Sequence, residues 1–148
     1  MIKLIKTIPA FPVRDIEKAV AFYKARLGFD CRHMEETLAI LIRNGIDLHL
    51  WASCNYSWKW KSIFLFLKPI SSGAESFLAG THSCRIEIKG IDELYKELKE
   101  KEVLHNEKTE IETTYYDTRE FATLDLYGNL LTFYENIQKE QTVQPSRF

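Results

Sequence analysis

Residues 14–51 read RDIEKAVAFYKARLGFDCRHMEETLAILIRNGIDLHLW, and this stretch decides the fold class. Its first half carries a helix pattern: Asp15 stands where an N-cap is needed, and apolar residues recur at helical spacing from Ile16 to Leu27. Gly28 follows, and glycine readily ends a helix because it adopts the left-handed conformation at no steric cost. The sequence therefore predicts a helix over residues 16–27.

The second half of the stretch predicts strands. Three strand-like runs follow the helix, at residues 29–34, 38–43 and 46–51. The dipeptide Asn44-Gly45 joins the last two, and it is the strongest short hairpin signal known. An extended segment over residues 8–13 precedes the helix, and its two prolines favour a position at a sheet edge. The first half of the chain is thus predicted to form a β-α-β-β-β module.

The rest of the chain repeats this order. Residues 84–89 alternate apolar and charged side chains, as a half-buried strand does, and Asp92 is the predicted cap of a helix over residues 92–102. Two late strands are predicted at residues 121–126 and 129–135, joined across Tyr127-Gly128-Asn129. One more strand is expected within residues 103–116.

A repeated module sets the fold class, because each open module leaves a sheet face that a neighbour must cover. We therefore expect an α+β fold of paired β-α-β-β-β modules with curved mixed sheets. The predicted domain covers residues 1–137, with modules at about 1–72 and 73–137. The remaining residues, 138–148, form a polar tail.

Composition and charge narrow the function classes. The 148 residues carry a net charge of −1, so no basic field recruits nucleic acid or an anionic membrane. No stretch approaches a membrane span or a signal peptide. The three cysteines are odd in number and lack CxxC spacing, which favours reduced thiols. These features predict a cytoplasmic protein with neither a nucleic-acid nor a membrane partner.

Four segments carry a resemblance to a known family: IPAFPVRDIEKAVAFY, LHLW, GAESFLAGTHSCRIEIKGIDELY and TREFATLDLYGNLLTFYE. They span most of residues 8–137 and resemble the bleomycin-resistance proteins of the glyoxalase, or vicinal oxygen chelate, superfamily. The resemblance implies a homodimer with two interfacial clefts that sequester a cationic, flat-ringed antibiotic of the bleomycin family, free or as its copper complex. It also implies a binding protein rather than an enzyme, with no cofactor.

Enzymes of the superfamily hold a divalent metal with two side chains from each module. In this sequence those positions are Ile8, His49, Ser83 and Thr132. Only His49 is a good ligand, and a catalytic site needs about three, so no metal site and no catalytic residue is expected. The alternative is a metal-dependent lyase or dioxygenase that combines His49 with non-standard ligands.

Strand alternation selects the first candidate binding residues. In the run 46–51, Ile46, Leu48 and Leu50 are predicted to face the core, while Asp47, His49 and Trp51 face a cavity. By the same alternation, Arg85 shares a face with Ser83 and Glu87, and Thr132 shares one with Tyr134. Cys84 falls on the apolar face beside Ile86 and Ile88, where we expect an inert thiol.

The resemblance adds further candidates. It implies an aromatic ring that stacks on the drug near Tyr115-Tyr116, followed by Asp117, and phenylalanines where this chain has His33 and Leu38. Glu35 and Glu36 lie between these two positions and add negative charge. The expected ligand-binding set is His33, Glu35, Glu36, Leu38, His49, Trp51, Arg85, Tyr115, Tyr116 and Asp117.

Two further tryptophans, Trp58 and Trp60, alternate with lysines in the loop after residue 53. Three interpretations stay open for them: packing over the core or a dimer seam, a wall of the cleft, or a stacking platform for nucleic acid. Only three charged residues, all lysines, lie between residues 53 and 72, and no basic stripe extends them. The nucleic-acid interpretation is therefore the least favoured.

Overall fold

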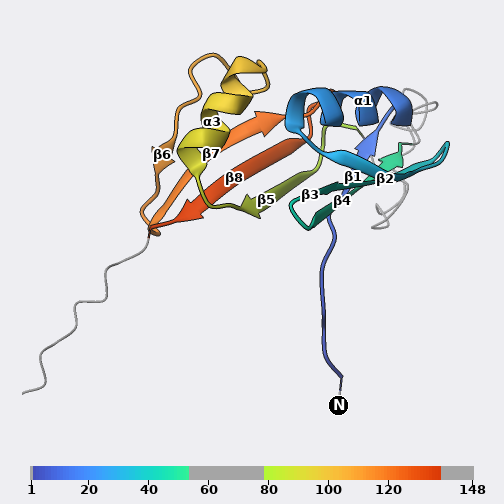
Figure 1. Cartoon of the computed structure of the whole chain (residues 1–148), viewed down its shortest axis with the longest axis horizontal. Helices are drawn as coiled ribbons and strands as arrows, with labels where there is room; N and C mark the ends of the chain where they lie inside the picture. Colours follow the sequence, from blue (N-terminus) through green and yellow to red (C-terminus); the bar gives the residue numbers. More distant parts are fainter. Residues whose placement is uncertain (1, 54–78, 138–148) are drawn as a thin grey trace, which may run out of the picture.

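The computed structural model describes residues 2–53 and 79–137. Its first module consists of β1 (Ala10–Val13), α1 (Ile16–Leu27), β2 (Asp30–Met34), β3 (Leu38–Arg43) and β4 (Ile46–Ala52). The four strands form one sheet in the order β1-β4-β3-β2 (Figure 1). In this sheet β1 runs parallel to β4, and the other neighbours are antiparallel.

The second module repeats this arrangement. It consists of β5 (Ser83–Glu87), α3 (Ile91–Glu100), β6 (Glu112–Thr113), β7 (Thr118–Leu124) and β8 (Leu130–Asn136). Its sheet order is β5-β8-β7-β6, with β5 parallel to β8. The strand expected within residues 103–116 is the short β6. The predicted α+β fold of two β-α-β-β-β modules is thus confirmed, although the module boundary, the tail, Trp58 and Trp60 lie outside the described residues.

Local sequence signals account for α1. The Asp15 carboxylate accepts a hydrogen bond of 3.0 Å from the backbone N–H of Lys18, as an N-cap should. Gly28 ends the helix in the left-handed conformation, with a φ of 68°. The predicted apolar positions form the buried face of the helix: Ile16, Ala19, Val20, Tyr23 and Leu27.

The prediction for the start of α3 is wrong. The N-cap is Gly90, with a φ of 85° and no side-chain cap, while Asp92 lies in the first turn. The Glu135 carboxylate of β8 instead accepts hydrogen bonds from the backbone N–H groups of Gly90 at 2.8 Å and Ile91 at 3.4 Å. Asp92 is engaged elsewhere, since its two oxygens accept hydrogen bonds of 2.8 Å from Arg119.

One prediction within β4 is also wrong. Ile46, expected in the core, is 42% exposed, because it is the first residue after the hairpin turn and lies beyond the end of the core. Asp47 lies on the same face as His49, as predicted, but it is only 8% exposed. Its carboxylate pairs with Lys6 of the N-terminal segment and with Arg32 at 3.6 Å, and both cover it. The hydrogen bond from Lys6 and the charge of Arg32 lower the pKa of Asp47.

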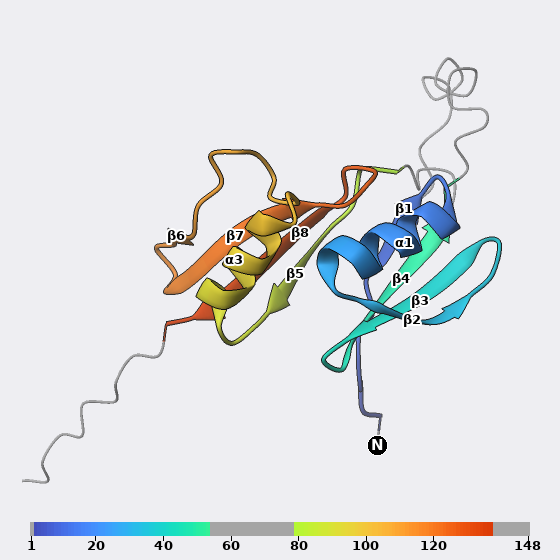
Figure 2. The same cartoon turned by 45° about the horizontal axis from the view of Figure 1, so that its top comes forward.

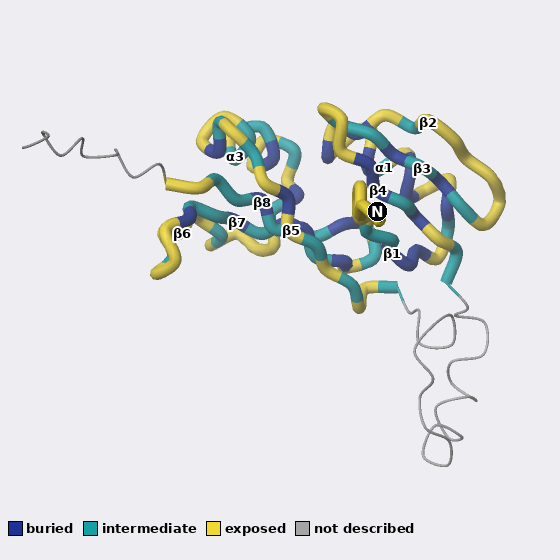
Figure 3. The backbone as a smooth tube through the Cα atoms, turned by 90° about the horizontal axis from the view of Figure 1, so that it is seen from below, coloured by how far each residue is buried: buried dark blue, intermediate teal, exposed yellow. Residues whose placement is uncertain are grey.

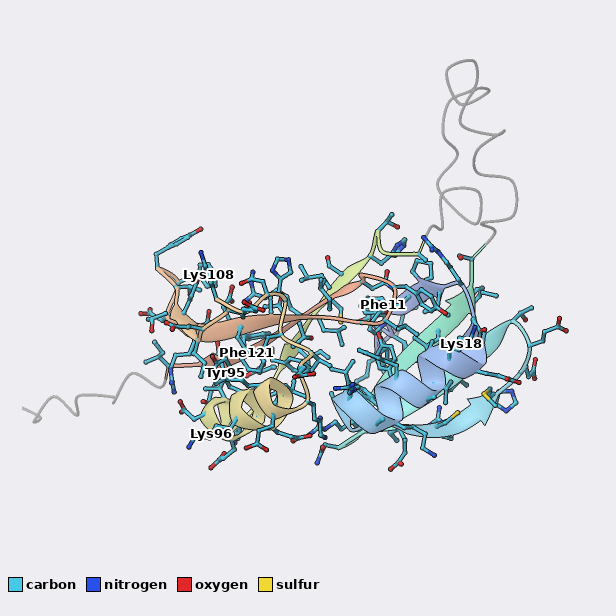
Figure 4. All side chains as sticks on the ribbon, turned by 90° about the horizontal axis from the view of Figure 1, so that it is seen from above. Phe11, Lys18, Tyr95, Lys96, Lys108 and Phe121 are labelled. Atoms are coloured by element: carbon cyan, nitrogen blue, oxygen red, sulfur yellow. The ribbon has the colours of Figure 1, made fainter. Side chains whose placement is uncertain are left out.

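Each sheet has one face covered by its helix and one open face. Figures 1 and 2 show the two sheets side by side, with α1 and α3 on the same side of the molecule. Buried residues lie on both helices and on the strands, whereas the turns are mostly exposed (Figure 3). In the second module, Tyr95 of α3 packs edge-on against Phe121 of β7, with ring centroids 5.4 Å apart (Figure 4). We call the two helix-free surfaces the first open face and the second open face.

A buried polar cluster joins the two modules. The Tyr23 hydroxyl of α1 donates to the Asp125 carboxylate at 3.1 Å, in the turn between β7 and β8. The Asn129 amide donates to the same carboxylate at 2.8 Å and to the Pro12 carbonyl of β1 at 2.9 Å. Burial and the nearby negative charge of Asp125 raise the pKa of Tyr23 well above its ordinary value, so the hydroxyl stays a donor. These bonds fix how the modules sit against each other.

Candidate functional site

Strand register shows which expected binding residues share the first open face. Ala39, Leu41, Leu48 and Leu50 are fully buried on the helix side, so their sequence neighbours face the opposite way. Leu38 is paired with Trp51, and Ile40 with both His49 and His33. The first open face thus carries four of the expected residues: His33, Leu38, His49 and Trp51.

The turn between β2 and β3 adds acidic groups to one end of this face. His33 Nε2 lies 2.8 Å from an oxygen of Glu35, and Glu36 follows in the same exposed turn. Both carboxylates also line a hollow of about 480 Å³ beside the start of α1. This end of the first open face therefore combines imidazole and carboxylate groups.

The second open face carries a tightly connected cluster around Arg85. One guanidinium nitrogen lies 2.6 Å from Glu120 Oε2, and another donates to the Tyr116 hydroxyl at 3.2 Å. The Tyr116 hydroxyl in turn lies 3.3 Å from both Glu120 oxygens. The guanidinium carbon lies 4.8 Å from the ring centre of Tyr134. The hydrogen bond to Tyr116 and the charge of Glu120 raise the pKa of Arg85.

Sequence reasoning did not select Glu120 as a site residue. The strand was expected to begin at residue 121, whereas β7 begins at Thr118 and pairs Glu120 with Tyr134. Alternation along the longer strand would have placed Glu120 on the same face as Tyr134. Tyr134 does share the second open face with Thr132, as predicted, and contacts Arg85.

The neighbours of Tyr116 lie in the turn between β6 and β7. Tyr115 is 97% exposed and meets Tyr116 edge to face, with ring centroids 4.8 Å apart and an interplanar angle of 85°. Asp117 adopts a positive φ of 59°, which turns the chain into β7. Tyr116 itself is 44% exposed, so its ring is available to a ligand although its hydroxyl is engaged.

The structure does not bring all ten expected residues together. In Figures 1 and 2, the turn between β2 and β3 and the turn between β6 and β7 lie at opposite ends of the long axis. A groove of about 610 Å³ lies between the modules, lined by residues such as Phe29, Arg43 and Leu94, but by none of the ten. Within one chain, the acidic turn and the tyrosine pair therefore lie at opposite ends of the described structure.

The four superfamily metal positions do not fit a metal site. Ile8 offers no ligand atom, and Ser83 and Thr132 offer only hydroxyl groups, which are poor ligands. Among residues 2–53 and 79–137, no group of three or more His, Cys, Asp or Glu side chains is placed to hold an ion. We therefore derive no reaction step through a metal.

Cys84 has the environment that its strand position predicted. It packs against the core beside Ile86, and burial raises the pKa of its thiol to about 11.

In the described part of the chain, no helix is both long enough and apolar enough to span a membrane.

Comparison with known proteins agrees with this fold. The family model for the bleomycin resistance protein-like N-terminal region matches residues 7–37. The bleomycin resistance proteins of Geobacillus stearothermophilus and Staphylococcus aureus are each 42% identical over 135 residues, which is 91% of this chain and 99% of theirs.

Two solved structures share the fold at lower identity. The bleomycin resistance determinant encoded on transposon Tn5 gives a TM-score of 0.66 at 22% identity, covering 90% of this chain and 98% of that one. The second is the bleomycin-binding protein from bleomycin-producing Streptomyces verticillus, complexed with copper(II)-bleomycin. It gives a TM-score of 0.67 at 21% identity, covering 94% of this chain and 100% of that one. With relatives 42% identical over nearly their whole length, the chain belongs to the bleomycin resistance protein family.

Proposed function

We propose that this chain binds a bleomycin-type antibiotic and sequesters it, in the cytoplasm and without catalysis. The observation that carries this function is the 42% identity to bleomycin resistance proteins across 99% of their length. A binding role needs no reactive group, and the second open face offers aromatic rings and carboxylates in place of a metal or a nucleophile. The free state of Cys31 and Cys84 agrees with a reducing compartment.

The chemistry around Tyr116 suits a flat, cationic ligand. Residues 107–120 contain five acidic and two basic side chains. Arg119 is turned away to Asp92 on α3, and Glu120 is neutralised by Arg85. The segment therefore carries an excess of negative charge next to the exposed Tyr115 and Tyr116 rings, which can stack on heteroaromatic rings.

We propose that the binding unit is a homodimer, with each cleft built from both copies. The first open face of one copy would form one wall, and the second open face of the other copy would form the opposite wall. Support comes from the separation of the two groups of expected residues along the molecule (Figure 1). Exposed apolar side chains, among them Ile2, Leu4 and Trp51, provide surface for a second copy to cover.

Calorimetric titration with metal-free and copper-loaded bleomycin tests this function. The wild-type protein should saturate near one drug per chain. In size-exclusion chromatography it should elute at the mass of two chains. Replacing Tyr116 by alanine removes a stacking ring, and we expect about tenfold weaker binding. Leu126→Ala is the control, because Leu126 is similarly exposed at 45% but lies in the turn between β7 and β8. Absence of saturable binding to either form of the drug would refute the proposal.

A further inference from the structure

We propose that Arg85 is a positioning residue: it holds the Tyr116 ring and the Glu120 carboxylate in place and does not itself bind the ligand. This inference rests on the proposed function, since it assigns a role within the same cleft. It changes the expectation from the sequence, in which Arg85 was one of the ligand contacts.

The terminal nitrogens of Arg85 already have partners within the chain, although 46% of its side chain is exposed. Its two terminal nitrogens are directed to Glu120 at 2.6 Å and to the Tyr116 hydroxyl at 3.2 Å. One face of its guanidinium lies over the Tyr134 ring at 4.8 Å. A planar guanidinium can bridge two acceptors at once because its donors form a rigid fork, which a lysine ammonium lacks. Arg85 therefore links β5, β7, β8 and the turn before β7.

Tyr116 needs such a support because of where it lies. The turn between β6 and β7 is exposed, and its neighbour Tyr115 is almost fully solvated. A ring on a free turn loses side-chain entropy when a ligand orders it, and a ring that is already fixed avoids this cost. Arg85 and Glu120 hydrogen-bond the hydroxyl oxygen of Tyr116, and the guanidinium carbon lies 5.5 Å from the centre of its ring, yet Tyr116 is still 44% exposed. The ring can therefore stay fixed and still present a surface to the ligand.

Charge makes the inference testable by sign. A cationic ligand is repelled by an arginine, so removing an arginine with no positioning role should leave affinity unchanged or increase it. Removing a positioning arginine should decrease affinity, even though Glu120 would then carry an unpaired negative charge near the ligand. The sign of the change therefore separates a positioning arginine from an arginine with no role in binding.

The first experiment is a double-mutant cycle between Arg85→Gln and Tyr116→Phe, with bleomycin affinity measured by calorimetry. Each single change should weaken binding about three- to tenfold, because each frees the ring. The double change should weaken binding no further than either single change, since both break the same linkage. Arg85→Lys should restore part of the loss. Arg119→Gln is the matched control: it breaks a comparable arginine–carboxylate pair to Asp92, and affinity should not change.

A second measurement needs no drug. In the unliganded wild-type protein, the ring-proton NMR shifts of Tyr116 should differ from those of a free tyrosine. In the Arg85→Gln variant they should move towards the free-tyrosine values. Unchanged shifts would overturn the inference, as would wild-type or tighter binding by Arg85→Gln. If the wild-type protein fails to bind bleomycin, the proposed function fails, whereas the NMR result still decides whether Arg85 positions Tyr116.

Discussion

Replacing Asn129 by alanine should destabilise the whole chain, because this side chain ties the two modules together. Asn129 is fully buried. Its amide nitrogen donates to the Pro12 carbonyl at 2.9 Å and to the Asp125 carboxylate at 2.8 Å. Its amide oxygen accepts from the backbone N–H groups of Gly80 at 3.0 Å and His82 at 3.4 Å. This one side chain thus makes four hydrogen bonds to three separate segments.

The size of the effect follows from what alanine leaves behind. The Pro12 carbonyl loses this donor, and the Asp125 carboxylate, only 6% exposed, loses one of its donors. A net hydrogen bond is worth about 1 kcal/mol, and one to a charged group about 1.5–3 kcal/mol. Because the His82 contact is long, we count three effective bonds and expect a loss of about 4 kcal/mol in the free energy of unfolding. That is a large share of the roughly 5–15 kcal/mol typical of a domain.

Urea unfolding followed by far-UV circular dichroism measures this loss. All variants should be compared at one protein concentration, because the apparent stability of a dimer depends on it. Asn136→Ala is the control: this asparagine is exposed at the far end of β8 and makes one 2.6 Å bond to Glu87, so we expect a loss below about 1 kcal/mol. If Asn129→Ala loses no more stability than Asn136→Ala, the cluster does not join the modules as argued.

Three further predictions concern single positions. Gly45 and Gly80 both have a φ of 81°, but a Cβ on Gly80 would lie 2.5 Å from a backbone oxygen, whereas one on Gly45 would meet nothing within 4 Å. Gly45→Ala should therefore cost about 1–2 kcal/mol in urea unfolding, and Gly80→Ala clearly more; equal losses would refute the clash. Iodoacetamide at pH 8 should leave Cys84 unmodified by mass spectrometry until urea is added, because its pKa is raised to about 11; rapid labelling of the folded protein would contradict this. The hydrogen bonds from Arg119 lower the pKa of Asp92. The pair therefore stabilises the folded state above about pH 4, and this contribution is lost as the pH falls through the lowered pKa of Asp92. Asp92→Asn should flatten the pH dependence of stability below about pH 4, and an unchanged profile would exclude this contribution.

The parts of the fold that could be predicted depend on local signals. The cap at Asp15, the stop at Gly28 and the hairpin at Asn44-Gly45 each act through neighbours within a few residues, and all three appear as expected. Strand alternation identified most side chains of both open faces for the same reason. Repetition of these local patterns was sufficient to give the two-module architecture.

The features that the sequence did not predict depend on partners that are distant in sequence. Glu135 of β8 caps the start of α3, although it lies 45 residues after Gly90 in the sequence. The prediction therefore chose the nearby acid Asp92 as the cap. Lys6 buries the Asp47 carboxylate from 41 residues away. The spacing of hydrophobic residues and the residue types found in turns carry no information about such distant pairs. Glu120 was missed because its strand was expected to start at residue 121, and no local signal indicates its partner Arg85 on another strand.

The placement of the site residues leads to a test of the two-copy cleft itself. Trp51 lies on the first open face and Tyr116 on the second. If each cleft takes one wall from each copy, a mixed dimer of a Trp51→Ala chain and a Tyr116→Ala chain has one cleft with both changes and one with neither. It should bind one drug per dimer at wild-type affinity, although each parent homodimer binds weakly. If both walls belonged to one chain, every cleft in the mixed dimer would carry a change, and no wild-type site would return. Calorimetric titration of a purified, differently tagged mixed dimer therefore decides between the two arrangements.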